Sequence, residues 1–384
     1  MFYMTLYKVG RWDVAVVWFR RDLRLSDHPA LTEALAGART VVPLYVFDER
    51  LLASAAPARA WFLRGSVAEL DRSLRERGSG LLVRAGDPRD VVPRVARMVD
   101  ADVVLASADV TPYARARDAA VAEALEHGGR RLDLRDGLLL ADPEHVRTGA
   151  GRPYTVFTPF WRKLQQAPRR GLLPAPTSVP TPPDLVAEEL RSAASPPLPG
   201  LPTPGEAAAQ ERLQRWVATD LAAYDSGREL LDGSGTSGLG ADLHFGTLSP
   251  LQVEVAAGEL GAEAEAFTRQ LAWRELYQHH LHHQATAPRP ASPLESAFRS
   301  ESDDPQAVAA WREGRTGIPT VDAAMRQLSA TGWMSNRARL ITASFLTRHL
   351  LMDWRIGERT FMAHLIDGAV ANNRGGGEWS AGVG

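Results

Sequence analysis

The run DVAVVWF at residues 13–19 decides the fold of the first part of the chain. It opens a series of short β-branched segments that alternate with helical patterns, which is typical of βαβ units winding a parallel sheet. We therefore expect a doubly wound α/β domain over residues 1–135, with ligands at the carboxyl ends of its strands. The other strands are expected at residues 40–46, 80–83, 102–106 and 131–134, and the helices at residues 29–36, 58–77, 89–98 and 114–126.

A proline-rich stretch separates this part of the chain from the next. Eleven prolines fall between Pro168 and Pro204, a composition typical of a connector rather than of a packed core. Beyond it the strand pattern disappears. We predict an interdomain connector over residues 136–204 and an all-α domain over residues 205–384, with helices at residues 206–224, 250–260, 263–283, 305–312, 321–330, 335–351 and 359–367.

The composition excludes several kinds of chemistry. The chain has no cysteine, which excludes disulfides, a thiolate nucleophile and metal sites that need sulfur ligands, so we expect catalysis to rest on a bound cofactor. The net charge is −2, and 42 of the 44 basic residues are arginines, so an anionic partner would need a local arginine patch. No apolar run is long enough for a membrane helix and no export signal is seen, which predicts a cytoplasmic protein.

The glycine-rich segment GSGTSGLG at residues 233–240 is a candidate binding element. Its glycines would let backbone N–H groups approach an anion, and Thr236 and Ser237 add hydroxyl donors. The segment lacks the lysine of a P-loop and does not follow a strand, so a plain flexible loop is an equal alternative.

Two histidines, His279 and His283, lie four residues apart on one predicted helix face, a separation that can bind a metal ion. No acidic third ligand stands nearby in the sequence, so we expect no metal here. Solvated histidines at a helix end, where the C-terminal dipole favours positive charge, explain the pattern better.

Two further groups of polar residues stand in apolar helical segments. Trp273 lies beside Gln270 and Arg274, and an aromatic ring with arginine on one face suits an unstacked base, although core filling is the default role of a tryptophan. Arg339 and Asp367 are a candidate pair beside a polar ligand, because buried charges persist when they are paired. A purely structural salt bridge is as good an explanation on this evidence.

Taken together, these segments resemble the photolyase/cryptochrome family, and most closely the bacterial class I DNA photolyases that act on cyclobutane pyrimidine dimers. The resemblance is carried by VVWFRRDLRLSDHPAL at residues 16–31, YTVFTPFWRKL at residues 154–164, LHFGTLSP at residues 243–250 and, most densely, residues 311–368. It implies an α/β antenna domain and a helical domain that holds FAD. It also implies light-dependent repair, in which excited reduced FAD gives an electron to a pyrimidine dimer in DNA, and a monomeric protein without a membrane partner.

The resemblance also implies roles for individual residues. Asn373 matches the asparagine that faces flavin N5, and Trp273 and Trp379 match the two tryptophans that wedge the flipped dimer, so these three are the implied catalytic residues. The residues matching FAD-binding positions are Tyr224, Thr236, Ser237, Gly238, Leu239, Gly240, Asn336, Arg339, Asp367, Gly368 and Asn373. Those matching DNA-binding positions are Arg228, Gln270, Trp273, Arg274, Asn336, Arg337 and Trp379.

Several positions depart from the family pattern. The three-tryptophan wire for light-driven flavin reduction keeps only Trp354, because Gly377 and Glu301 stand at the other two positions. We therefore predict poor light-driven reduction of oxidised FAD. Ala369 and Arg374 replace an aspartate and an asparagine near the FAD.

Other departures bear on substrate, antenna and stability. Gln270 stands where a glutamate usually touches the dimer; its amide can hydrogen-bond the bases but cannot protonate them. The segment TPYARARD at residues 111–118 lacks the Asn-Glu pair of folate-binding relatives, so either a deazaflavin antenna or no antenna is expected rather than a folate. The chain stops at SAGVG, where relatives continue through further helices. Two rival hypotheses follow, a cryptochrome-like blue-light receptor and an inactive, truncated photolyase.

Overall fold

The computed structural model describes residues 11–185, 187, 195–284 and 292–383. Its first part is a five-stranded, fully parallel sheet in the order β3-β2-β1-β4-β5. The expected α/β fold is confirmed, and every expected strand is present. The strands are β1 Trp12–Phe19, β2 Ala38–Phe47, β3 Leu82–Ala85, β4 Val103–Ser107 and β5 Arg131–Arg135.

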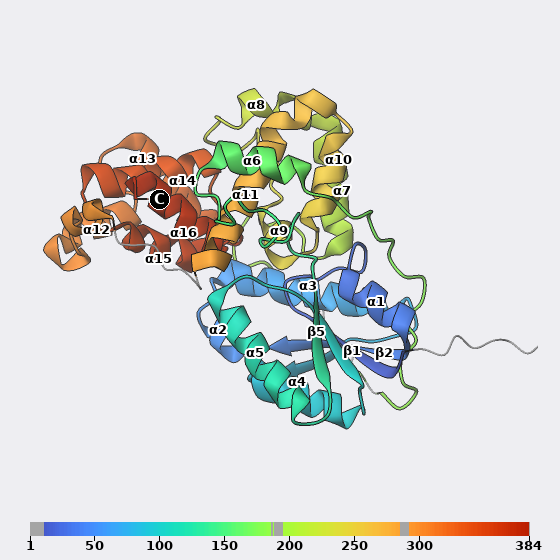
Figure 1. Ribbon diagram of the computed structural model, residues 1–384. Coiled ribbons are helices and arrows are strands. Elements are labelled where there is room, and N and C mark those ends of the chain that lie inside the picture. The colour runs from blue at the N-terminus through green and yellow to red at the C-terminus, as the bar shows by residue number, and fades with distance from the viewer. Residues whose placement is uncertain (1–10, 186, 188–194, 285–291, 384) are drawn as a thin grey trace, which may run out of the picture.

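Helices cover both faces of this sheet (Figure 1). Alternate residues of β1 point to opposite faces: Val17 joins a core with α1 and α3, whereas Val16 joins a core with α4 and α5. Strands β2 and β3 are added on one side of β1, and β4 and β5 on the other. The order of the strands therefore reverses between the neighbours β1 and β4, and the carboxyl ends of these two strands form the topological switch point. The helices are α1 Pro29–Gly37, α2 Glu49–Ala53, α3 Pro57–Arg75, α4 Pro88–Met98 and α5 Pro112–Glu126.

The rest of the chain builds a helical domain in two lobes (Figure 1). Each lobe has its own hydrophobic core. One core lies around α6, α7, α10 and α11, and the other lies around α12 to α15. Within the described residues no helix is long and apolar enough to span a membrane. The α-helices are α6 Phe157–Gln166, α7 Glu206–Thr219, α8 Tyr224–Gly227, α9 Gly240–Phe245, α10 Pro250–Gly258, α11 Glu265–Gln284, α12 Pro305–Arg312, α13 Pro319–Thr331, α14 Asn336–Ser344, α15 Trp354–His364 and α16 Val370–Ala381.

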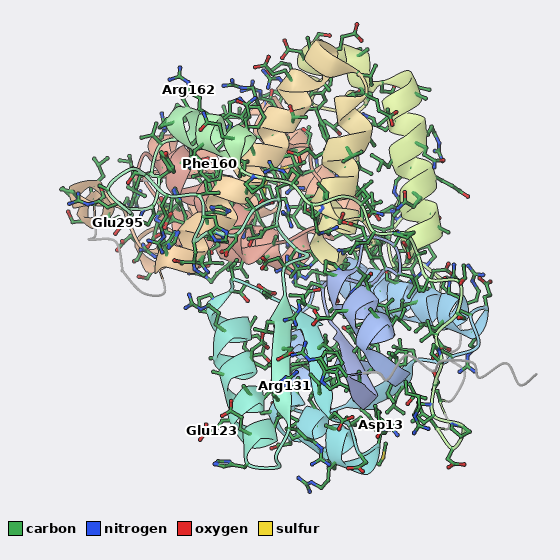
Figure 2. All side chains as sticks on the ribbon, turned by 45° about the vertical axis from the view of Figure 1, so that its right-hand side comes forward. Asp13, Glu123, Arg131, Phe160, Arg162 and Glu295 are labelled. Carbon is green, nitrogen blue, oxygen red and sulfur yellow. The ribbon has the colours of Figure 1, made fainter. Side chains whose placement is uncertain are left out.

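The stretch expected as a connector differs from that expectation in part. Helix α6 lies within residues 136–204 and places Phe160, Trp161 and Leu164 in the core of the α6–α11 lobe. Figure 2 shows Phe160 turned into the domain and Arg162 turned outward. Apolar residues three and four positions apart give this helix a buried face. The proline-rich part also packs, because Val179 is buried in the core of the α/β domain.

Helix α16 was not expected, because three successive glycines disfavour a helix. The structure shows why glycine is needed there. A Cβ atom on Gly375 would lie 2.2 Å from the ring of Tyr277 on α11, and one on Gly377 would lie 2.9 Å from the ring of Trp354 on α15. The glycines let α16 approach both neighbouring helices closely, so tertiary packing overrides the low helix propensity.

The helical domain is seated on the α/β domain through buried polar contacts. The carboxylate of Glu206 accepts hydrogen bonds from the backbone N–H groups of Leu25 at 2.6 Å and Ser26 at 2.9 Å. The fully buried guanidinium of Arg24 donates to the carbonyls of Gly246, at 3.0 Å, and of Gly137, at 2.9 Å. Because each buried polar group has a partner, these contacts fix the relative position of the two domains.

Candidate functional site

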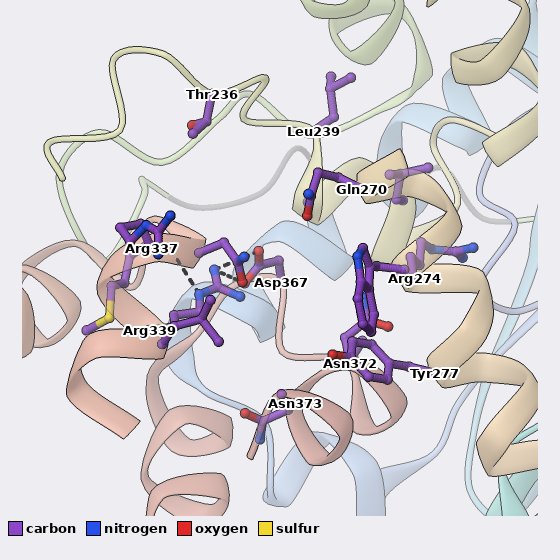
Figure 3. Close-up of a pocket in the computed structure, with 18 of the residues that line it drawn as sticks. Thr236, Leu239, Gln270, Arg274, Tyr277, Arg337, Arg339, Asp367, Asn372 and Asn373 are labelled. Atoms are coloured by element: carbon purple, nitrogen blue, oxygen red, sulfur yellow. Dashed lines mark hydrogen bonds and ion pairs between the residues drawn. The ribbon is translucent and has the colours of Figure 1, made fainter. Parts of the chain in front are cut away.

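A cavity of ≈ 510 Å³ opens in the helical domain between the glycine-rich loop and helices α11, α14 and α16 (Figure 3). It brings together nearly all the residues that the sequence singled out, although they lie on separate elements. Those that line it are Tyr224, Arg228, Thr236, Ser237, Gly238, Leu239, Gly240, Gln270, Trp273, Arg274, Asn336, Arg337, Arg339, Asp367, Asn373 and Trp379. Gly368 and Trp354 are the two that do not line it.

The glycine-rich loop forms one wall of the cavity. Gly238 has a φ of +66°, a conformation that favours glycine, and no atom lies within 4 Å of where its Cβ would stand. A Cβ on Gly240 would lie 2.4 Å from a carboxylate oxygen of Asp367. The loop therefore lines the cavity with the small hydroxyl residues Thr236 and Ser237 and with the backbone of Gly238 and Gly240, a combination that can accommodate a phosphate group.

Arg339 on α14 and Asp367 before α16 form the expected ion pair in the cavity wall. One guanidinium nitrogen lies 2.9 Å from both carboxylate oxygens, and Nε donates to the carbonyl of Met334 at 2.9 Å. Arg337 turns to Glu229 instead, with which it forms an ion pair. The pair of Arg339 and Asp367 leaves further guanidinium donors and carboxylate lone pairs for a polar ligand.

Three cavity-lining residues carry buried polar atoms that have no hydrogen-bond partner within the described part of the chain. They are Oδ1 of Asn372, Nε of Arg228 and Nδ1 of His244. Burial lowers the pKa of His244 well below its usual value, so its ring is neutral at physiological pH. Unpaired buried polar atoms are costly, so we take these three as positions that a polar ligand satisfies.

The neighbouring Asn373 is held differently. Its side-chain nitrogen donates to the backbone carbonyl of Glu358 on α15 at 2.8 Å. This bond fixes the amide plane and leaves the side-chain oxygen as an acceptor. The orientation suits a ligand that presents an N–H group to this wall.

Helix α11 contributes an aromatic face. Gln270, Trp273 and Tyr277 follow one another at helical spacing and all line the cavity. The indole of Trp273 stacks on Phe157 of α6, with ring centroids 4.2 Å apart and an interplanar angle of 5°. One face of Trp273 is therefore covered, and it is the remaining face and edge that are available to a substrate.

Arg274 lines the cavity, but its guanidinium is held by internal partners. Its guanidinium turns away from the cavity to the buried carboxylate of Glu275, at 2.7 Å, and to the carbonyl of Leu138, at 3.1 Å (Figure 3). Burial raises the pKa of Glu275 to about 7, although the attraction of Arg274 opposes this. A buried carboxylate requires a partner, and Arg274 serves that internal role.

The family resemblance assigned the three positions of a tryptophan wire to Gly377, Trp354 and Glu301. Gly377 lines the cavity, and Trp354 lies directly behind it, with 2% of its surface exposed. Glu301 forms ion pairs with Arg312 and Arg359. The aromatic path from the cavity therefore has Trp354 at its middle position and no tryptophan at the position before or after it.

His279 and His283 were expected to be solvated histidines at a helix end, but both are buried. The Nε2 atom of His279 lies 3.2 Å from the carbonyl oxygen of Ala141, and burial lowers the pKa of this ring to about 3. His279 is therefore a neutral, buried side chain that packs between helices.

Some cavity residues were missed at the level of sequence. Tyr277 could have been found, because it follows Trp273 by four positions and Gln270 by seven on the same helix face. Arg21 and His244 carried no such signal, because they come from the α/β domain and from a six-residue helix. Their place in the wall depends on how the two domains meet.

Comparison with known proteins gives a consistent result. A family model described as DNA photolyase matches residues 15–183, and one described as FAD binding domain of DNA photolyase matches residues 267–384. The deoxyribodipyrimidine photo-lyase of Synechococcus sp. is 41% identical over 96% of this chain and 81% of that protein. The cryptochrome DASH of Natronomonas pharaonis is 38% identical over 97% of this chain and 84% of that protein.

Solved structures show the same architecture. A bacterial class III photolyase from Agrobacterium tumefaciens superposes with a TM-score of 0.88 at 32% identity, covering 98% of this chain and 81% of that one. An archaeal photolyase from Sulfolobus tokodaii, whose structure holds two FAD molecules, superposes with a TM-score of 0.82 at 27% identity, covering 97% of this chain and 83% of that one.

Proposed function

The chain belongs to the DNA photolyase family, and from this premise we propose that its cavity holds FAD and uses it to split cyclobutane pyrimidine dimers in DNA under light. The observation that carries the proposal is that one cavity joins the glycine-rich loop, the pair of Arg339 and Asp367, and the two tryptophans Trp273 and Trp379. The loop and the ion pair offer contacts to a cofactor, and the two tryptophans offer stacking surfaces to a base.

The residues present fit FAD. The loop at residues 236–240 offers backbone N–H groups and two hydroxyls to a diphosphate, and Tyr224 and Leu239 give the wall a buried apolar part. Asn373 offers a fixed acceptor, and Asn336, Arg339 and Asp367 offer polar contacts along a flavin ring. When bound in its reduced form, FAD supplies the light-excited electron that opens the cyclobutane ring. The protein's part is to position the cofactor and to exclude water.

A flipped dimer would enter the same cavity beside the cofactor. Trp379 on α16 has 51% of its surface exposed, Trp273 on α11 has one face covered by Phe157, and both line the cavity. Stacking on such rings is tolerant of base identity, and Gln270 offers an amide to the base edges. Arg228, Arg337 and Asn336 are the polar residues we assign to the DNA strand around the dimer.

A second chromophore would bind in the α/β domain, at the switch point between β1 and β4. Arg20 extends from the end of β1 into this region, where it pairs with Asp118 at 2.5 Å and donates to the carbonyl of Ser107. The resemblance favours a deazaflavin there rather than a folate.

The test is an absorption spectrum of the purified protein followed by a repair assay on an oligonucleotide that contains one thymine dimer, under blue light with added reductant. Near-stoichiometric flavin with light-dependent loss of dimers supports the proposal. Protein without flavin, or flavin-bearing protein that leaves dimers intact in the light, contradicts it.

A second candidate, a cryptochrome-like receptor, is favoured by Gln270 in place of a glutamate and by the similarity to a cryptochrome DASH. Flavin that responds to light in a protein that repairs no dimers would support it. The loss of two tryptophans from the wire argues against it, because it weakens signalling that depends on light-driven reduction of the flavin.

A further inference from the structure

The histidine-rich end of α11 meets two other parts of the molecule at one point. The segment after β5 brings Glu144 beside this end, and Arg115 of α5 donates to the backbone carbonyl of His282 at 2.9 Å. The cavity lining on α11 extends to Gln278, and none of Glu144, His282 and His283 belongs to it. The point is therefore distinct from the cavity and independent of the proposed function.

Three metal-ligating side chains converge here. The Oε1 atom of Glu144 lies 2.9 Å from Nε2 of His282, and the rings of His282 and His283 have centroids 4.9 Å apart. One ligand atom from each of the three residues lies within 4.8 Å of the others. The sequence pattern had suggested a different histidine pair without an acid; the fold supplies both a new pair and the missing carboxylate.

We propose that Glu144, His282 and His283 form a binding site for one divalent transition-metal ion of the zinc type. Two imidazoles and one carboxylate are a common donor set for such ions, with a water in the fourth position. The ion would tie the C-terminal end of α11 to the segment that follows β5.

Contacts around the three side chains support this assignment. A hydrogen bond from His283 to the backbone carbonyl of Pro143 orients its ring, and Arg147 holds the second oxygen of Glu144, while its other nitrogen donates to the carbonyl of Gly151 at 2.9 Å. Outer contacts of this kind orient metal ligands in known sites.

The charges that face the site do not all favour a cation. Arg147 lies on the far side of the carboxylate, and Arg115 lies at the helix end. Against them stand Glu144 itself and the negative end of the α11 dipole. Arg147 is bound to the Oε2 atom of Glu144 and to the carbonyl of Gly151, so it competes with a cation for this carboxylate and limits the affinity. The Oε1 atom of Glu144 faces His282 and is the atom offered to the ion.

The test is calorimetric titration of the full-length, tag-free, EDTA-treated protein with ZnCl₂ at pH 7.5. We expect one equivalent of Zn²⁺ to bind. Glu144→Gln and His282→Gln keep the size and a hydrogen-bonding amide, and each should weaken binding by at least about tenfold. His280→Gln is the matched control, because His280 sits on the same turn but its Nε2 lies 2.8 Å from the carbonyl of Tyr154.

A second measurement separates a site from scattered surface histidines. Saturating Zn²⁺ should raise the unfolding temperature of the wild type and of His280→Gln by a few degrees, and should leave Glu144→Gln unchanged. The proposal is overturned if the wild type binds no Zn²⁺, or if Glu144→Gln and His282→Gln bind it as tightly as the wild type. Circular dichroism of each variant shows that a lost signal is not lost folding.

Discussion

At the scale of single residues, the identity of residue 270 determines whether the cavity wall offers an amide or a carboxylic acid at this position. Gln270 presents an amide where related proteins are expected to present an acid. An amide donates and accepts hydrogen bonds but has no proton to give. If a dimer occupies the cavity as proposed, this side chain would contribute hydrogen bonds to its binding and no acid to the step that follows electron transfer.

We expect Gln270→Glu to raise the number of dimers repaired per absorbed photon, and Gln270→Met to lower the affinity for dimer-containing DNA. A lost hydrogen bond to the base is worth about 1 kcal/mol, or roughly fivefold in Kd. The measurements are single-flash repair and fluorescence-anisotropy titration. Equal repair and equal affinity in all three proteins would show that residue 270 does not touch the substrate.

The stacked pair of Phe157 and Trp273 supports a second prediction. Phe157 is buried and covers one indole face at 4.2 Å, and Arg269 lies 5.4 Å from the ring of Phe157. This contact fixes where Trp273 stands. Aromatic pairs are worth about 0.5–1.5 kcal/mol beyond their buried area.

Phe157→Leu should therefore weaken binding of dimer-containing DNA by roughly three- to tenfold. Phe157→Tyr should bind this DNA as tightly as the wild type, because the aromatic ring is kept. Binding of undamaged DNA and the flavin content should stay unchanged in both. If Phe157→Leu lowers flavin content and all DNA binding together, its role is general stability and not the position of Trp273.

At the scale of elements, helix α16 depends on backbone proximity. Gly375 meets the ring of Tyr277, whereas no atom lies within 4 Å of a Cβ placed on Gly376. Gly375→Ala should lower the unfolding temperature of the flavin-free protein, because overpacking costs about 1–3 kcal/mol. Gly376→Ala should raise it, because alanine is favoured over glycine in a helix by about 1 kcal/mol. Differential scanning calorimetry measures both, and equal shifts would mean that α16 does not pack on α11 in this way.

The same elements show what the sequence could and could not predict. The β1 and β2 runs were placed within two residues, because an uninterrupted β-branched segment has few alternatives to a buried strand. Helix α16 was missed because its glycines disfavour a helix when the local sequence is considered alone. They are required by close packing against Tyr277 and Trp354, which are distant in the sequence. Helix α6 was assigned to a connector, although its apolar spacing was visible.

The candidate site could likewise be predicted from the sequence only in part. Residues that repeat at helical spacing, such as Gln270 and Trp273, could be grouped from the sequence, and the family resemblance linked them to the loop at residues 236–240. The inward turn of Arg274 could not be foreseen, because it depends on the burial of Glu275 against Leu140, whose N–H donates to that carboxylate at 2.8 Å. Side-chain direction at a domain junction is set by partners that a local pattern does not contain.

At the scale of the whole molecule, a buried histidine links stability to pH. His279 packs edge-on to Phe160, with centroids 5.1 Å apart, and burial lowers its pKa to about 3 from a usual 6.5. The unfolded chain thus binds a proton on this ring at a higher pH than the folded chain does. The stability that the neutral ring contributes is fully present above pH 6.5 and is lost as the pH falls toward 3, by about 1.4 kcal/mol per pH unit.

His279→Gln should remove one proton from this dependence, because an amide can still donate to the carbonyl of Ala141 but does not titrate. Urea unfolding at a series of pH values between 4 and 7 measures the slope, and the variant's curve should be flatter by about one proton. The exposed His127 gives the control, since His127→Gln leaves no buried ring changed and should keep the wild-type slope. A slope unchanged in His279→Gln would mean that this ring is charged or hydrated in the folded protein, and that the acid sensitivity comes from other groups, among them carboxylates whose pKa is lowered by folding.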